Sequence, residues 1–98
     1  MNIQAMMKQA QALQKEMLKE KDAIDEMEFL GESSFVKVTV NGKKEILKVE
    51  INNDENLQLD DLDMLSDMFV IATNNAMKMV DEMITEKMGK FGNMPGLF

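Results

Sequence analysis

The spacing of apolar residues changes period twice along this 98-residue chain, and few folds are compatible with that change. Over residues 3–27 apolar side chains recur in alternating steps of three and four, with only Glu20 breaking the series, and neither glycine nor proline interrupts them. This heptad stripe contains Ile3, Met6, Ala10, Leu13, Met17, Ile24 and Met27. The pattern predicts one helix over residues 3–27.

Within residues 28–51 the period becomes two, which is typical of strands. Asn41-Gly42 separates two such runs and favours a two-residue hairpin loop, because both residues tolerate positive φ. That loop pairs Val40 with Lys43, Val38 with Glu45 and Val36 with Leu47. A four-residue loop would keep the same two faces, whereas a three-residue loop would mix them. The expected apolar face contains Val36, Val38, Val40, Leu47, Val49 and Ile51, and the lysine-rich face contains Phe35, Lys37, Thr39, Lys44, Ile46 and Lys48.

A second helix is predicted over residues 60–88, with Asp60 as N-cap and Gly89 after its end. It carries two apolar stripes, more than one neighbouring layer can cover. We therefore expect a homodimer, since a chain of this length buries only roughly 60–65% of its unfolded surface alone. The interface is expected at the second stripe, which contains Met64, Met68, Ile71, Val80 and Ile84.

These elements predict a single α+β domain over residues 1–98, with a three-stranded antiparallel sheet between two long helices and a flexible tail at 89–98. The opening residues mix amides and Lys8 with apolar side chains, so no secretion signal is expected. The longest apolar run, residues 68–72, is far shorter than the ~20 residues of a membrane span. We expect a cytoplasmic protein that does not enter membranes.

All basic residues are lysines, and the chain has no histidine, cysteine, tryptophan or tyrosine. It therefore lacks the usual proton shuttle and thiol nucleophile, and we expect neither an enzyme nor a cofactor or small-molecule substrate. Residues 52, 54, 56 and 63 fit four ligand positions of a calcium loop, but Leu57 stands where that loop needs glycine. A helix-capping linker explains the same residues, so we expect no metal.

Charge is segregated along the chain despite a net charge of −7. Net positive charge falls in residues 1–21 (+2) and 37–48 (+3), and negative charge in residues 22–36 (−5) and 49–67 (−7). Because the field at a surface is set by charges within a Debye length of ~8–10 Å, lysine-rich surfaces could bind phosphates. Lysine without arginine favours backbone contacts over base reading.

Four strings in this order resemble the YbaB/EbfC family of bacterial nucleoid-associated proteins. They are Met6-Met7-Lys8-Gln9-Ala10-Gln11, the hairpin from Val36 to Gly42, the segment from Asp61 to Leu65, and Glu86-Lys87-Met88-Gly89-Lys90 followed by Met94-Pro95-Gly96-Leu97-Phe98. The resemblance implies a tweezer-like homodimer that binds duplex DNA with low sequence specificity and associates with the nucleoid, organising it or modulating gene expression. By position it implies DNA contacts at Lys8, Lys15, Lys19, Lys87 and Lys90.

The charge pattern adds the hairpin lysines Lys37, Lys44 and Lys48 as candidate DNA contacts. A competing hypothesis is a prefoldin-like chaperone or protein-interaction module that uses methionine-rich helix surfaces. The twelve methionines and the apolar residues of the tail favour that alternative, because adaptable apolar groups suit nonspecific protein capture.

Overall fold

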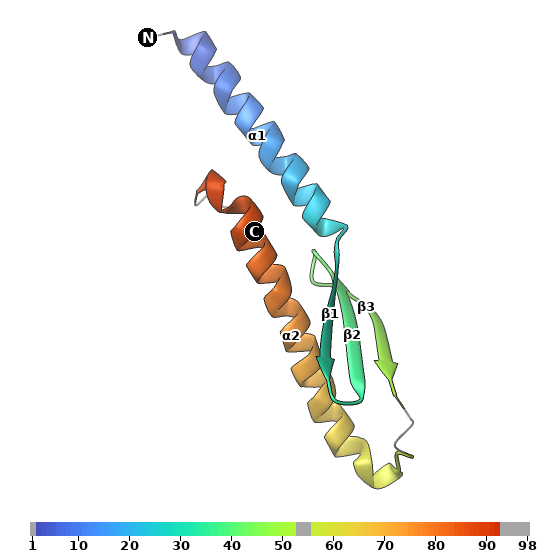
Figure 1. Ribbon diagram of the computed structural model, residues 1–98. Coiled ribbons are helices and arrows are strands. Elements are labelled where there is room, and N and C mark those ends of the chain that lie inside the picture. The colour runs from blue at the N-terminus through green and yellow to red at the C-terminus, as the bar shows by residue number, and fades with distance from the viewer. Residues whose placement is uncertain (1, 53–55, 93–98) are drawn as a thin grey trace.

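Two long helices and one small antiparallel sheet form an elongated molecule of 71 × 18 × 17 Å. The computed structural model describes residues 2–52 and 56–92. Figure 1 shows the C-terminal helix covering the sheet along one half of its length and then running beside the N-terminal helix. The elements are α1 (Ile3–Asp25), β1 (Glu28–Ser33), β2 (Val36–Asn41), β3 (Ile46–Ile51), the 3₁₀ turn η1 (Leu59–Asp61), α2 (Leu62–Met88) and the 3₁₀ turn η2 (Gly89–Phe91).

Helix α1 begins at a capping side chain and ends two residues before the predicted end. The Oδ1 atom of Asn2 accepts hydrogen bonds from the backbone N–H groups of Gln4 at 3.0 Å and Ala5 at 3.4 Å. This satisfies donors that have no partner within the first turn. At the other end the N–H of Met27 turns back to the carbonyl of Ile24, so the chain enters β1 at residue 28.

The sheet has the order β1-β2-β3 with both pairs antiparallel. The predicted two-residue hairpin loop is wrong, and so are its pairings. Residues 42–45 form a four-residue loop, in which Asn41 Oδ1 accepts the N–H groups of Lys43 at 2.9 Å and Glu45 at 3.0 Å. These two bonds stabilise a wider turn than the predicted one. The observed pairs include Val36 with Ile51, Val38 with Val49 and Val40 with Ile46.

A bulge in this hairpin explains the changed register. Thr39 pairs with Lys48 and Val40 with Ile46, so Leu47 is an extra residue in β3. Ile46, predicted on the lysine-rich face, therefore lies opposite the buried Val40. Of the loop residues, Lys44 has a positive φ of 63°. Gly42 has another role, because a Cβ atom there would lie 1.9 Å from the carbonyl oxygen of Ile24.

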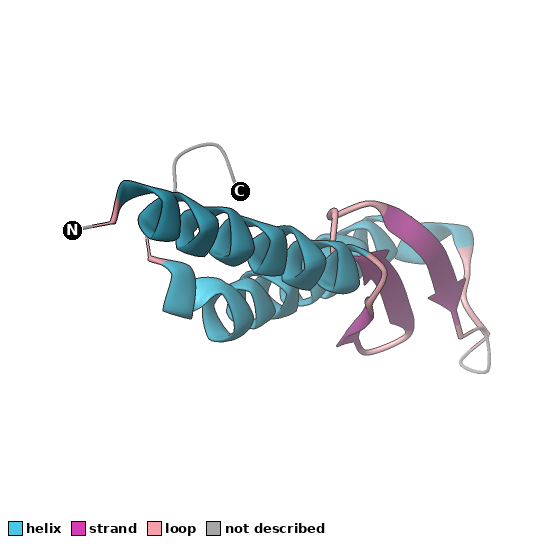
Figure 2. Cartoon of the chain, turned by 90° about the horizontal axis from the view of Figure 1, so that it is seen from above, coloured by secondary structure: helices cyan, strands magenta, loops and turns pink. Residues whose placement is uncertain are grey.

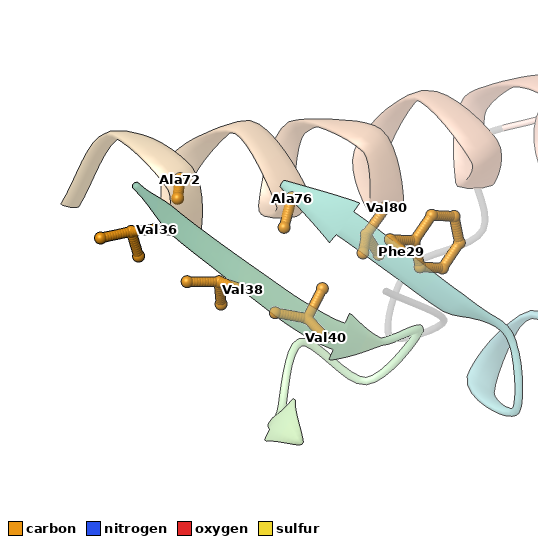
Figure 3. Packing of buried hydrophobic residues seen from close by; sticks show 7 residues of the cluster. All are labelled: Phe29, Val36, Val38, Val40, Ala72, Ala76 and Val80. Atoms are coloured by element: carbon orange, nitrogen blue, oxygen red, sulfur yellow. The ribbon is translucent and has the colours of Figure 1, made fainter. Parts of the chain in front are cut away.

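The main core lies between the sheet and α2, where small helix residues allow close packing. Gly31 of β1 meets the backbone of α2, and a Cβ atom on it would lie 2.0 Å from the carbonyl oxygen of Ala72. Of the α2 residues buried against the sheet, Val80 belongs to the second predicted stripe, whereas Ala72 and Ala76 do not. Figure 3 shows the cluster, which contains Phe29, Val36, Val38, Val40, Ala72, Ala76 and Val80.

A second, smaller core joins the two helices away from the sheet. Met17 and Ile24 of α1 pack with Met88 and Phe91, and all four are buried. Figure 2 shows α1 and α2 side by side in this region. Phe91 belongs to η2, which lies within the predicted tail, and the rest of that tail, from residue 93, lies outside the described residues.

The start of α2 also differs from the prediction, because η1 precedes it. The N-cap of α2 is Asp61, and Asp60 lies within η1. The backbone N–H of Gln58 donates to Asp61 Oδ2 at 2.8 Å, as part of a capping box. Acidic residues thus lie at the positive end of the helix dipole, as electrostatics favours.

Candidate nucleic-acid interface

Lys8, Lys15 and Lys19 lie on one side of α1. At 100° per residue they fall within an arc of about 40°, opposite the side that Met17 and Ile24 bury against α2. All three lysines are exposed. They extend over 11 helix positions, which corresponds to about 16 Å along the axis. We call these three residues the α1 lysine row.

The acidic residues close to the α1 lysine row in sequence form no ion pair with it in the described part of the chain. None of its three ammonium groups forms an ion pair there. Glu16, which neighbours Lys15 in sequence, pairs instead with Lys90 at 3.1 Å. The α1 lysine row therefore presents positive charge that is free for an anionic partner.

The hairpin lysines have carboxylates as neighbours. Lys37 lies between Glu32 and Glu50 in the strand register, one on each adjacent strand. Glu50 also forms an ion pair with Lys48 at 3.4 Å. Cross-strand neighbours of opposite charge attract one another, so this face of the sheet has little net positive charge.

Lys44 lies in the hairpin loop beside α2, where its Nζ atom is 2.6 Å from Asp81 Oδ1. Lys43, which sequence reasoning did not single out, lies next to it and forms no ion pair within residues 2–52 and 56–92. Both line an open hollow of about 620 Å³ where α1, the loop and α2 meet. In the sequence, Asn41-Gly42 indicates that Lys43 lies in or next to a loop. The position of Lys43 beside α2 depends on the tertiary fold.

The two C-terminal lysines lie near the end of α2. Lys87 is exposed in the last turn, where a cation interacts favourably with the helix dipole. Lys90 pairs with Glu16, and its Nζ atom lies 5.0 Å from the centre of the Phe91 ring. Lys90 thus helps join η2 to α1, whereas Lys87 forms no ion pair with any of the residues that the structure describes.

The α1 lysine row and the aspartates around the start of α2 lie towards opposite ends of the long axis. Figure 1 shows the N-terminus of α1 at one end and the start of α2 at the other. The start of α2 carries the acidic residues Asp60, Asp61, Asp63 and Asp67. This separation places the α1 lysine row far from these four aspartates, whereas Asp22, Asp25, Glu26 and Glu28 lie together nearer to it, at the end of α1 and the start of β1. The N-terminal part of the row, around Lys8, is the part most distant from acidic residues along α1.

The predicted dimer-interface residues fall into three groups. Met64 and Ile71 are exposed, Met68 and Ile84 are partly buried against the chain's own core, and Val80 is fully buried in that core. A different apolar surface lies between β3 and α2. All residues of β3 are exposed, so this surface is open to solvent. This surface, which we call the β3 groove, is lined by Val36, Val49, Ile51, Leu62, Leu65, Ser66, Phe69 and Val70.

The described residues contain neither a metal-ligating cluster nor a membrane-spanning helix. Across residues 2–52 and 56–92, His, Cys, Asp and Glu nowhere form a group of three or more that could hold a metal ion. None of the helices described is both long and apolar enough to cross a membrane. Asp54 of the calcium-loop template lies outside the described residues.

The fold and the lysine surface are those of a small α+β protein with a candidate polyanion-binding helix. The model of the YbaB/EbfC DNA-binding family matches residues 1–94. A nucleoid-associated protein of Clostridium novyi (strain NT) is 43% identical over 103 residues, covering 100% of this chain and 90% of the relative. One of Oceanobacillus iheyensis is 43% identical over 102 residues, covering 99% and 97%. One of Streptococcus pneumoniae (strain Hungary19A-6) is 39% identical over 98 residues, covering 97% and 98%.

The chain therefore belongs to the YbaB/EbfC DNA-binding family, as the four sequence strings predicted. The description of this family names DNA binding. The match gives no support to the prefoldin-like alternative.

Proposed function

We propose that this protein is a cytoplasmic, nucleoid-associated homodimer that binds duplex DNA with low sequence specificity through lysine–phosphate contacts. The observation that carries the proposal is the α1 lysine row, which is exposed and free of ion pairs among the described residues. Ammonium groups attract phosphates as point charges and lack the planar fork that reads guanine. Binding should therefore depend on the DNA backbone more than on its sequence.

The β3 groove supports the homodimer. β3 is an edge strand, with backbone groups available to a further strand, and it carries the half-exposed side chains of Val49 and Ile51. Leu62 and Val70 of α2 are also exposed and lie in the same groove. A second copy would remove this apolar surface from water. We accordingly place the proposed interface at the β3 groove; Met64 and Ile71 do not line this groove.

A dimer would also double the α1 lysine row. Two rows of three lysines could neutralise up to about six phosphates. Six contacts correspond to a slope of about −5 in a plot of log affinity against log salt concentration, at about −0.9 per phosphate. Lys87 and the loop lysines would add to this slope where the duplex reaches them.

A salt-titrated binding experiment tests the proposed function. Fluorescence anisotropy should be recorded with labelled duplexes of unrelated sequence, from 50 to 300 mM KCl, with a single strand in parallel. We expect affinities for the different duplexes to agree within a few-fold and to fall with a slope of about −3 to −5. A flat salt response, or affinity for one duplex alone, would contradict phosphate-based binding.

A further inference from the structure

The hollow of about 620 Å³ lies where the end of α1, the loop after β2 and the C-terminal part of α2 meet, and we call it the loop hollow. Figure 1 shows this loop beside the end of α1, on the side of α2. Buried Gly42 allows the close approach, because a Cβ atom there would lie 1.9 Å from the carbonyl oxygen of Ile24. The volume is within the range of about 300–1,000 Å³ that is typical of small-molecule pockets.

Lysines from α1 and from the loop border the loop hollow. Lys21, Lys43 and Lys44 line it, and Asp81 is the one acidic residue among the described lining residues. Lys43 forms no ion pair within residues 2–52 and 56–92, whereas Lys21 pairs with Asp25. Lys44 pairs with Asp81, but these side chains are 45% and 61% exposed, and such exposed pairs contribute little free energy. Lys43 and Lys44 can therefore both turn towards an anion in the hollow.

Apolar side chains of α2 line the same hollow. Ile84 and Met88 are one helical turn apart, and Met88 is held in place because it is buried against Met17 and Ile24 of α1. A thioether makes favourable contacts with the edge of an aromatic ring. The exposed Thr85 lies between these two residues in the sequence, and its hydroxyl can donate a hydrogen bond to a phosphate oxygen. This lining suits a ligand with one anionic end and one flat apolar part.

The surroundings of the loop hollow favour a small anion over a long polyanion. Lys43 also borders a neighbouring hollow, which is lined by Asp22, Asp25, Glu26 and Glu28. Successive phosphates of a duplex would come near these carboxylates, whereas a single phosphate can remain among the lysines. At 100° per residue, Lys21 lies about 140° around α1 from the middle of the α1 lysine row. A duplex on that row therefore leaves this side of α1 open.

We propose that the loop hollow binds a nucleoside monophosphate, with the phosphate between Lys43 and Lys44 and the base against Ile84 and Met88. This site is separate from the α1 lysine row, so the small anion and duplex DNA can be bound at the same time. Because the chain has no histidine or cysteine, the hollow holds this molecule as a ligand and not as a substrate.

Titration calorimetry of the full-length chain compares adenosine monophosphate (AMP) with adenosine and with ribose 5-phosphate. AMP should bind with a millimolar or lower dissociation constant and at least five-fold more tightly than either analogue, because each analogue lacks one of the two contacts. Lys43→Gln should weaken AMP binding at least three-fold. No binding at about 10 mM AMP, or equal affinities for AMP and ribose 5-phosphate, would overturn the proposal.

Lys78→Gln is the matched control in this titration. Lys78 is also exposed, forms no ion pair with any residue that the structure describes, and lies outside the loop hollow. Its substitution removes the same charge and should leave AMP binding unchanged. Equal losses in Lys43→Gln and Lys78→Gln would show that AMP responds only to the overall charge of the protein.

Methyl NMR of the methionines locates the bound AMP. AMP should shift the signal of Met88, assigned with Met88→Leu, and leave that of Met79, which is exposed and outside the hollow. In the anisotropy assay at constant ionic strength, saturating AMP should change duplex affinity less than two-fold. Equal shifts at both methionines would contradict binding in the loop hollow, and displacement of the duplex would contradict a separate site.

Discussion

At Gly31 and Gly89 the same substitution should have opposite effects. Gly31→Ala places a methyl group against the backbone of α2, 2.0 Å from the carbonyl oxygen of Ala72. Neither backbone can move away without separating the sheet from the helix. We expect a loss of about 2–4 kcal/mol in the free energy of unfolding, measured by urea denaturation.

Gly89→Ala is the matched control. Its added methyl group meets nothing within 4 Å, and the residue has a helical φ of −58°. Alanine should be neutral or stabilise the protein by up to about 1 kcal/mol, because it restricts the unfolded chain. Equal losses at both glycines would show that Gly31 does not control the approach of α2.

The lysines also differ from one another in ways that binding can detect. Lys8→Glu with Lys15→Glu should weaken duplex binding at least ten-fold and reduce the salt slope by about 3 to 4 in a dimer, since four phosphate contacts are lost. Lys44→Glu with Lys48→Glu makes the same change in charge on side chains that pair with Asp81 and Glu50. This control should lose markedly less affinity in the same anisotropy assay. The reverse order would place the DNA on the sheet.

Among the elements, α1 is divided into a packed half and a projecting half. Its first turn depends on Asn2, whose side chain accepts two backbone hydrogen bonds. Asn2→Ala should weaken the helix end by about 1 kcal/mol, and Asn2→Ser should restore most of it. Because the described contacts of α1 begin near Met17, we expect faster amide exchange at residues 3–8 with little change in the urea midpoint. A large fall in the midpoint would show that the helix start is coupled to the core.

The sheet shows where sequence patterns identify an element but miss its register. Alternation predicted the strands within residues 28–51, and all three strands lie there. The loop was predicted from the φ preference of Asn-Gly, whereas Asn41 organises it through its side chain. Gly42 lies against Ile24 of α1, which is 18 positions earlier in the sequence. The local φ preference of Asn-Gly cannot predict that contact.

For the whole molecule, the proposed dimer predicts a mass of twice 11.2 kDa in analytical ultracentrifugation. Val49→Lys with Ile51→Lys should raise the dissociation constant of the dimer at least ten-fold, because charges would enter an apolar interface. Both residues are half-exposed in the single chain, so its fold should persist.

Met79→Lys is the control for this shift. Met79 is also an exposed apolar residue of α2, but it lies outside the β3 groove. Its substitution should leave the mass unchanged. A wild-type protein that sediments as a monomer at micromolar concentration would contradict the dimer, whatever the variants do.

The sequence by itself determined the order and type of the elements, because period and capping are local properties of the chain. It also supported membership of the family, and it placed three lysines on one side of α1. Only the tertiary structure decided which apolar side chains are buried. Val80 and Ile71 belong to the same predicted stripe, yet Val80 lies in the core and Ile71 remains exposed. The close approach of Gly31 to α2 selects the helix residues that meet the sheet, and such packing depends on contacts between residues far apart in the sequence.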